Sequence, residues 1–343
     1  MPRKDSASDK TGSALPRIAL LSLGGTIGVP VDQGGRGSAV ALGAADLLAA
    51  LPMLAEIADV QPQAFLAKMS ADLSVADIVA LATEIARLAA GGIDGVVVTQ
   101  GTDTIEETAY LLDLLCPPDL PVVVTGAMRN PGRPGADGPA NLVAAIRVAA
   151  SAEATGMGVL VVMDDTVHLA RFVRKAHSFA TGAFVSTRVG PVGYVIEDRV
   201  RIPLVPRAPS LRFVLPEAAS LPDVALMTMS LGSDEWLLGK VAEVSYRGLV
   251  VEAFGAGHVT ARIVPTLERL AQAIPVVFAS RAGDGELYRA TGSYPGSEGD
   301  LLARGLISAV GLDGRKARLL LTLLIATGAS REAMVQAFEQ ASL

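Results

Sequence analysis

The sequence is poor in cysteine, in aromatic residues and in charged residues. Among 343 residues there is one cysteine, Cys116, which excludes an intrachain disulfide and a metal cage built from several cysteines. Aromatic residues make up 4% and charged residues 19% of the chain, whereas 50% is hydrophobic, a composition typical of a folded protein. Because Leu114 and Leu115 precede Cys116, we expect a buried, unreactive thiol.

Two further absences concern partners and location. The formal net charge is -6 and no dense basic tract is present, which argues against nucleic acid as the main partner. No stretch approaches the roughly 18 uncharged apolar residues of a membrane-spanning helix, so we expect no membrane partner. Residues 1–16 form a polar tail without the apolar run of a secretory signal. Together these features predict a cytoplasmic location.

Short aliphatic runs alternate with segments of helical pattern, which predicts an α/β fold with mostly parallel strands and helices on both faces. Four prolines between positions 203 and 216 interrupt the pattern. We therefore predict a polar tail (1–16), a larger N-terminal α/β domain (17–202), a proline-rich linker (203–217) and a smaller C-terminal α/β domain (218–343). The strands predicted in the larger domain are Ile18–Leu23, Gly95–Thr99, Val122–Thr125 and Val159–Met163.

Threonine-containing loops follow the first two of these strands. In open parallel sheets, ligands bind beyond the carboxyl ends of the strands, so both loops are candidate site segments. The first, Gly24-Gly25-Thr26-Ile27-Gly28, has neither the glycine spacing of a dinucleotide loop nor the Lys-Ser/Thr pair of a P-loop. An ordinary tight turn is the alternative interpretation of this loop.

The second loop, Gln100 to Thr104, leads into a predicted helix. Thr104 and Glu107 have the spacing of a capping box, which leaves Thr102 and Asp103 just ahead of the helix N-terminus. Free backbone N–H groups at that position attract anionic or developing oxyanion atoms. Asp137 is expected to cap a later helix in the same way. Taken by itself, Lys175 is typical of a solvated surface lysine.

Together these stretches resemble the bacterial-type L-asparaginase and glutaminase-asparaginase family. The likeness runs from about Arg17 to the C-terminal region, and its longest stretch, residues 98–109, is ungapped and therefore the most specific. The matching stretches are 23–27, 98–109, 124–129, 136–142 and 158–166, with Lys175 downstream and Lys316-Ala317-Arg318 near the C-terminus.

The resemblance implies hydrolysis of the side-chain amide of L-asparagine, without a metal or organic cofactor, in a homodimer or homotetramer whose subunits share sites. The catalytic residues that it implies are Thr26, Thr102, Asp103 and Lys175. In substrate binding, Ser70 and Asp103 would hold the α-carboxylate and α-ammonium, and Ala127 would offer a carbonyl to the amide nitrogen. The other implied substrate-binding residues are Gly25, Gly101 and, from the partner subunit, Glu298 and His258.

Three departures from the family pattern keep alternatives open. Residues 28–43 contain no tyrosine, where the family carries one that helps to activate the first threonine. Ala71 replaces a glutamine, and His258 replaces an asparagine. The open alternatives are a glutaminase-asparaginase of broader specificity and a catalytically weak amino-acid-binding regulatory protein.

Amide hydrolysis needs a nucleophile, a proton acceptor and stabilisation of the tetrahedral oxyanion. We hypothesise that Thr26 attacks the side-chain carbonyl, while Thr102, Lys175 and Asp103 relay protons and activate the water of the second half-reaction. Attack by Thr102, or directly by water, is the alternative that the sequence leaves open.

Overall fold

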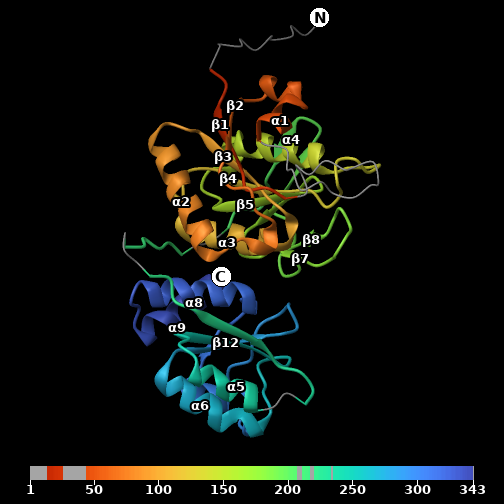
Figure 1. Ribbon diagram of the computed structural model, residues 1–343. Coiled ribbons are helices and arrows are strands. Elements are labelled where there is room, and N and C mark those ends of the chain that lie inside the picture. The colour runs from red at the N-terminus through yellow and green to blue at the C-terminus, as the bar shows by residue number, and fades with distance from the viewer. Residues whose placement is uncertain (1–13, 26–43, 207–210, 217–219, 233–234, 343) are drawn as a thin grey trace, which may run out of the picture.

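The structure is a computed structural model that describes residues 14–25, 44–206, 211–216, 220–232 and 235–342. Within these ranges the chain forms an eight-stranded and a four-stranded sheet, each flanked by helices, and a separate two-stranded sheet. The larger, N-terminal part lies above the smaller, C-terminal part in Figure 1.

An eight-stranded sheet forms the centre of the N-terminal part, in the order β10-β9-β6-β5-β4-β3-β1-β2. From β2 to β5 the neighbouring strands are parallel, whereas β6, β9 and β10 pair antiparallel. The strands are β1 (Arg17–Ser22), β2 (Asp59–Ala64), β3 (Gly95–Thr99), β4 (Val122–Thr125), β5 (Val159–Met163), β6 (Thr166–Leu169), β9 (Gly193–Ile196) and β10 (Arg199–Arg201).

Helices cover both faces of this sheet, which is why its central strands are continuous apolar runs. Along β1, Ala19 and Leu21 belong to the core that α2 and α3 complete, whereas Ile18 and Leu20 belong to the core that α4 completes. The helices are α1 (Ala44–Ala49), α2 (Val75–Ala90), α3 (Ile105–Leu115) and α4 (Gly138–Ala149).

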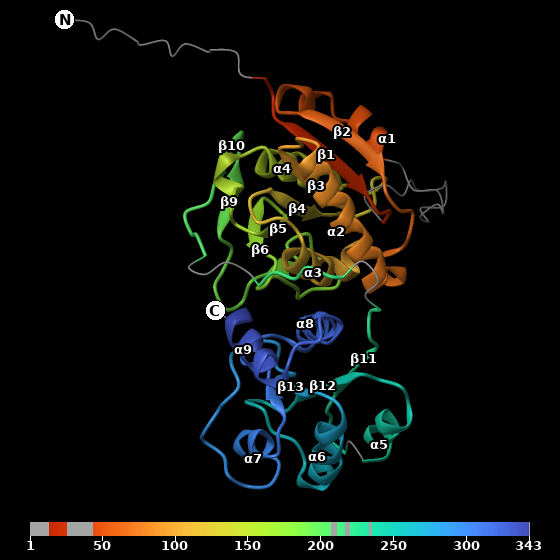
Figure 2. The same cartoon turned by 90° about the vertical axis from the view of Figure 1, so that its left-hand side faces the viewer.

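The C-terminal part contains a parallel four-stranded sheet, ordered β11-β12-β13-β14. Its helices α8 and α9 lie on the side of the N-terminal part, whereas α5 and α6 lie on the opposite side (Figures 1 and 2). The elements are β11 (Val224–Thr228), α5 (Glu235–Glu243), β12 (Gly248–Ala253), α6 (Val264–Ala273), β13 (Val276–Ser280), α7 (Glu298–Ala303), β14 (Ile307–Ser308), α8 (Gly314–Ala326) and α9 (Arg331–Ala341).

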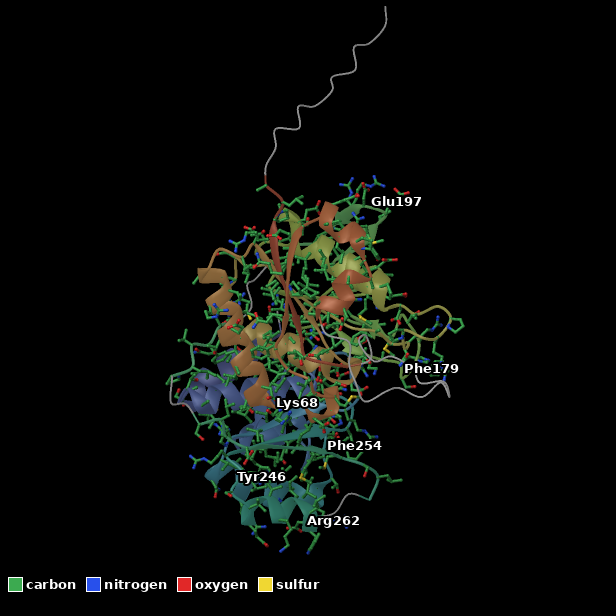
Figure 3. All side chains as sticks on the ribbon, turned by 45° about the horizontal axis from the view of Figure 1, so that its top comes forward. Lys68, Phe179, Glu197, Tyr246, Phe254 and Arg262 are labelled. Carbon is green, nitrogen blue, oxygen red and sulfur yellow. The ribbon has the colours of Figure 1, made fainter. Side chains whose placement is uncertain are left out.

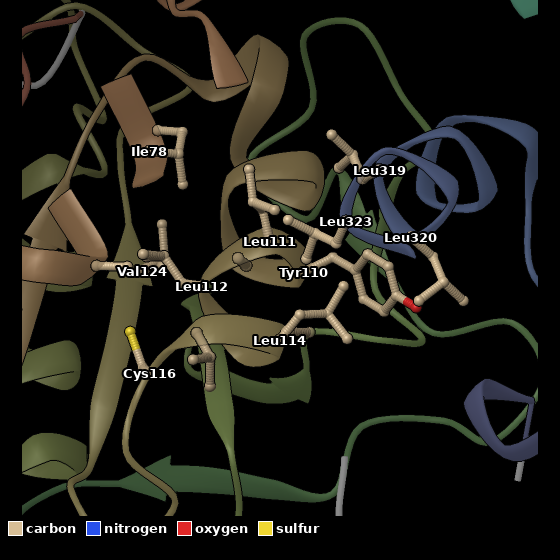
Figure 4. Packing of buried hydrophobic residues seen from close by; sticks show 14 of the residues in the cluster. Ile78, Tyr110, Leu111, Leu112, Leu114, Cys116, Val124, Leu319, Leu320 and Leu323 are labelled. Carbon is tan, nitrogen blue, oxygen red and sulfur yellow. The ribbon is translucent and has the colours of Figure 1, made fainter. Parts of the chain in front are cut away.

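A single hydrophobic cluster joins the two parts. Tyr110 and Leu112 of α3 belong to the same cluster as Leu320 and Leu323 of α8 (Figure 4). Cys116 lies in this cluster too, so its expected burial is confirmed, and this burial raises the pKa of its thiol to about 12. Helix α3 directly follows the candidate loop 100–104. Its contact with α8 therefore connects that loop to the C-terminal part.

The predicted fold class is confirmed, with a larger mostly parallel sheet and a smaller parallel one. The sequence did not reveal β2, because this edge strand is polar and largely exposed and so lacks an apolar run. In the proline-rich stretch, the described residues form no helix or strand, yet Leu211, Phe213 and Leu215 pack against the core. The domain boundaries themselves stay a prediction. Among the described helices, none combines the length and the apolar content needed to cross a bilayer.

Candidate functional site

The loops that follow β1, β3 and β4 meet at the carboxyl edge of the larger sheet. The Leu23 N–H donates to the Thr99 carbonyl at 2.9 Å, and the Gln100 N–H donates to the Thr125 carbonyl at 3.2 Å. Gly25 has a φ of +92°, and a Cβ atom there would lie 2.1 Å from the Gly101 nitrogen. Only glycine therefore allows the first loop to touch the second.

Thr102 and Asp103 lie in a short 3₁₀ helix, η4 (Thr102–Thr104), directly after β3. Thr102 is buried, whereas the Asp103 side chain is 66% exposed. The Ser70 hydroxyl lies 3.2 Å from Asp103 Oδ2, and a Cβ atom on Gly101 would lie 2.7 Å from that hydroxyl. The structure thus brings together Gly25, Ser70, Gly101, Thr102 and Asp103, whose roles in catalysis and substrate binding stay a prediction.

The predicted capping box at Thr104 is wrong. Thr104 is the N-cap residue of α3, but its side chain makes no capping hydrogen bond. Its hydroxyl instead donates to the Ser70 carbonyl at 3.0 Å and accepts from Gln100 Nε2 at 3.2 Å. Thr104 therefore ties the Ser70 segment to the second loop, because tertiary partners replace the local one.

Lys175 reaches this loop from β7 (Arg174–Lys175), which pairs with β8 (Phe184–Val185). Its Nζ lies 2.9 Å from Thr102 Oγ1 and 2.8 Å from Asp103 Oδ1. Only 15% of the Lys175 side chain is exposed, so the interpretation as a solvated surface lysine is wrong. The hydrogen bond from Lys175 lowers the pKa of the Asp103 carboxyl below its ordinary value, and burial opposes this effect.

The segment that connects β7 to β8 has a different character at its tip. Phe179 is 74% exposed and lies at the edge of the molecule in Figure 3. The hairpin thus places a shielded lysine at one end and an exposed aromatic ring at the other.

The loop after β4 lies beside the same cluster. A Cβ atom on Gly126 would lie 2.6 Å from the Gln100 carbonyl oxygen and 3.3 Å from Thr102 Cγ2, and buried Ala127 follows. Asp137 occupies the N-cap position of α4 but makes no side-chain cap, which corrects the sequence prediction. Its carboxylate instead accepts the N–H groups of Met128 and Arg129, at 2.9 and 2.8 Å. This fixes the turn that carries Ala127.

Glu298 and His258 form a separate pair in the C-terminal part. Glu298 is fully buried, and its Oε1 accepts the N–H groups of Thr291 and Gly292, at 2.8 and 2.5 Å. Its Oε2 lies 3.4 Å from His258 Nε2 and has no hydrogen-bond partner within the described ranges. The hydrogen bond from Gly292 and other backbone donors lower the pKa of Glu298. The carboxylate is therefore held ionised with one oxygen available.

Comparison with known proteins shows which family shares this arrangement. The family profile described as "Asparaginase, N-terminal" matches residues 17–206, and "Glutaminase/Asparaginase C-terminal domain" matches residues 223–338. The chain belongs to the asparaginase family of amidohydrolases. The family resemblance noted in the sequence is thereby confirmed.

Relatives within the asparaginase family match nearly the whole chain. An L-asparaginase of Bacillus licheniformis is 34% identical over 91% of this chain and 96% of its own. A glutaminase-asparaginase of Pseudomonas fluorescens is 31% identical over 91% of this chain and 86% of its own. The crystal structure of a probable cytoplasmic L-asparaginase from Campylobacter jejuni superposes with a TM-score of 0.85 at 32% identity, covering 94% of this chain and 99% of that one.

One residue implied by the asparaginase resemblance, Thr26, lies outside the described residues, as does the tyrosine-free stretch 28–43. Glu298 and His258 are described, but no hydrogen bond or ion pair within the described part links them to Thr102, Asp103 or Lys175. Figure 2 shows α7, which begins at Glu298, in the layer of the C-terminal part that is remote from the N-terminal part.

Sequence reasoning missed residues that surround Lys175. Glu106 accepts the Lys175 backbone N–H, Arg315 pairs with Glu106, and buried Lys316 contacts the chain just before Lys175. The burial of Lys316 could have been recognised from the sequence, because it lies on the apolar face of α8 with Leu319, Leu320 and Leu323. No comparable signal marked the pairing of Glu106 with Arg315.

Proposed function

We propose that the protein hydrolyses the side-chain amide of L-asparagine to L-aspartate and ammonia through a threonine nucleophile. The observation that carries this proposal is the contact of Lys175 Nζ with both Thr102 Oγ1 and Asp103 Oδ1. A threonine hydroxyl is a weak nucleophile until a base accepts its proton, and a lysine amine at 2.9 Å is within reach of that proton. Relatives named as L-asparaginases support the choice of substrate.

The reaction has two half-reactions. In the first, the Thr26 oxygen bonds to the side-chain carbonyl carbon and passes its proton to the base, which later delivers it to the leaving nitrogen. The resulting tetrahedral intermediate collapses, the C–N bond breaks, and the nitrogen leaves as ammonia after taking up a proton. In the second, water attacks the threonyl ester and donates a proton to the base. The ester C–O bond then breaks, the Thr26 oxygen takes up that proton from the base, and aspartate is released.

Thr102, Lys175 and Asp103 serve both halves of this scheme. Lys175 is the base, and its bond to Thr102 provides a path along which a proton moves to or from the reacting group. Asp103 holds the ammonium form of Lys175 once the proton has been transferred. Thr102 as the nucleophile, with the same base, is the alternative that this geometry also supports.

Substrate binding uses groups at the same sheet edge. Ser70 and Asp103, whose side chains lie 3.2 Å apart, are suited to the α-carboxylate and α-ammonium respectively. The Ala127 carbonyl is proposed to accept from the amide nitrogen. Gly25 and Gly101, which allow neighbouring loops to lie in close contact, are the other proposed substrate-binding positions.

We infer that the second subunit of a homodimer or homotetramer supplies Glu298 and His258 to this site. Glu298 is enclosed and ionised, and its Oε2 has an unused acceptor within the described residues, which suits an ammonium group. Because α7 is remote from the N-terminal part of the same chain, a partner is needed to bring Glu298 to the substrate (Figure 2).

Glutaminase activity is the second candidate, favoured by the likeness to a glutaminase-asparaginase. An ammonia-release assay with asparagine and glutamine as separate substrates tests the proposal. We expect turnover of asparagine with a higher kcat/KM than glutamine. Thermal stabilisation by asparagine without ammonia release would instead identify an amino-acid-binding protein and contradict the proposal.

A cytoplasmic location is also proposed, and the likeness to a probable cytoplasmic asparaginase of Campylobacter jejuni supports it.

A further inference from the structure

The strand that carries Lys175 has little support from its own sheet. Both β7 and β8 contain two residues, and among the described strands they pair only with each other. An isolated two-stranded ribbon is marginally stable at best in water. A lysine also has a long side chain with several rotatable bonds. The position of Lys175 Nζ beside Thr102 therefore depends on contacts from outside this ribbon.

Glu106 supplies one such contact from the first turn of α3. Its Oε2 accepts the Lys175 backbone N–H at 2.5 Å, and its Oε1 lies 2.7 Å from Arg315 NH1 of α8. Glu106 is 2% exposed, and this burial raises the pKa of its carboxyl, whereas the charges of Arg315 and Lys316 act in the opposite direction. Arg315 is thus the counter-charge that favours a carboxylate at the backbone of Lys175.

Lys316 supplies the second contact from the same turn of α8. Its Nζ donates to the carbonyls of Val173 and Arg171, at 2.6 and 3.1 Å, two and four residues before Lys175. The Asp313 carboxylate lies 3.8 Å away, and the Tyr110 ring centroid 5.9 Å away. Lys316 is 1% exposed. Burying an ammonium group is costly, and a well-packed apolar residue often stabilises such a position as well or better. Stability alone therefore gives little reason for a lysine here.

We propose that Arg315 and Lys316 are positioning residues for Lys175: α8 of the C-terminal domain holds the chain that carries Lys175 so that its amine stays beside Thr102. Arg315 acts through Glu106 on the Lys175 N–H, and Lys316 acts on the preceding carbonyls. The inference rests on the proposed function, in which Lys175 is the base. According to this inference, the C-terminal domain of the same subunit helps to fix the position of the Lys175 amine and thereby affects the rate of proton transfer.

The test compares Arg315→Met and Lys316→Met with a matched control, Arg318→Met. Arg318 lies on the same helix and pairs with Glu107 of α3 at 3.5 Å, so it joins the same two helices through a carboxylate other than Glu106, which accepts the Lys175 N–H. Activity is measured as ammonia release from asparagine, at a temperature well below the Tm of every variant. We expect kcat to fall about 10- to 100-fold in Arg315→Met and Lys316→Met, with KM little changed, because a small displacement of a base slows the reaction steeply.

The control and a conservative variant separate positioning from a general structural effect. Arg318→Met should keep kcat within about twofold of wild type even where its Tm falls, and Arg315→Lys should recover most of the loss. Equal kcat values for Arg315→Met, Lys316→Met and Arg318→Met would overturn the proposal. So would a fall in kcat that follows Tm alone across all the variants.

A crystal structure of Arg315→Met supplies a readout independent of activity. We expect Lys175 Nζ to move out of hydrogen-bond distance of Thr102 Oγ1, or to occupy more than one position. An unchanged Lys175–Thr102 contact would overturn the positioning role. Substantial ammonia release by Lys175→Met would instead contradict the proposed function, and the crystal structure would still decide whether α8 positions Lys175.

Discussion

Glu298 Oε2 lies 3.4 Å from His258 Nε2, and this buried oxygen has no hydrogen-bond partner within the described ranges. A buried carboxylate oxygen without a partner is costly, so a ligand that donates to it is expected. The pair belongs to the C-terminal part, whereas Lys175 and Thr102 belong to the N-terminal part. This separation is the reason that we propose a site shared between subunits.

Mixed oligomers test that sharing. A Thr102→Val subunit and a Glu298→Gln subunit should each be nearly inactive alone, because one lacks the hydroxyl beside Lys175 and the other the anionic partner of the ammonium. In a dimer that combines them, one site regains both groups. We expect random mixing to restore about a quarter of wild-type ammonia release.

Subunit exchange must be demonstrated in the same sample, by mass spectrometry of differently tagged subunits. Exchanged hybrids that remain as inactive as the parents would contradict a shared site. Glu298→Ala provides a second variant, since it removes the acceptor completely, and it should give the same pattern of rescue.

His168 predicts a pH dependence of stability. It is 2% exposed, its Nε2 lies 2.9 Å from Thr166 Oγ1 and its Nδ1 lies 3.0 Å from Ser186 Oγ, and burial lowers its pKa to about 4. Below the ordinary histidine pKa, residue 168 of the unfolded chain therefore binds a proton. In the folded protein the imidazole of His168 stays neutral until the pH approaches about 4. Stability contributed by neutral His168 is present above about pH 6.5 and is lost as the pH falls toward the folded pKa.

Urea unfolding of wild type and His168→Gln at pH 7 and pH 4.5 measures this effect. Between the two pH values, wild type should lose about 2 to 3 kcal/mol more of its free energy of unfolding than the variant, which has no titrating imidazole. Equal losses in both proteins would show that His168 is not the group responsible.

A diazo-ketone analogue of asparagine distinguishes the two candidate nucleophiles. Such a reagent alkylates the group that attacks the side-chain position, and peptide mass spectrometry locates the adduct. We expect the label on Thr26, with Thr102 and Lys175 assisting from the second loop. A label on Thr102 would support the alternative, in which the described Thr102–Lys175 pair carries out the first attack itself.

The sequence predicted the central architecture well because the buried parallel strands are uniform apolar runs. The run 95–99, for example, is buried at every position in β3. The glycines in the turns at the strand ends also indicated where loops meet, because Gly25 and Gly101 lie where two loops are in close contact. The buried strands and the glycine turns were therefore placed correctly from the local pattern.

Predictions failed where long-range partners replaced local ones. Thr104 has the spacing of a capping residue, but its hydroxyl bonds to the Ser70 carbonyl, 34 residues away in the sequence. Asp137 likewise binds the turn after β4 instead of its own helix. The ion pair between Glu106 and Arg315 joins two helices that lie far apart in the sequence. No local periodicity identifies such a pair.

Lys175 is proposed to act as a base beside Thr102, and the decisive measurement is kcat for ammonia release from asparagine. Lys68→Met is the matched control, because Lys68 Nζ (Figure 3) also pairs with an aspartate at 2.8 Å, but that partner is Asp77 and not Asp103. Lys175→Met and Thr102→Val should lower kcat by about a thousandfold or more with Tm nearly unchanged, while Lys68→Met stays close to wild type. Near-normal ammonia release by either Lys175→Met or Thr102→Val would show that Lys175 is not the base that acts beside Thr102.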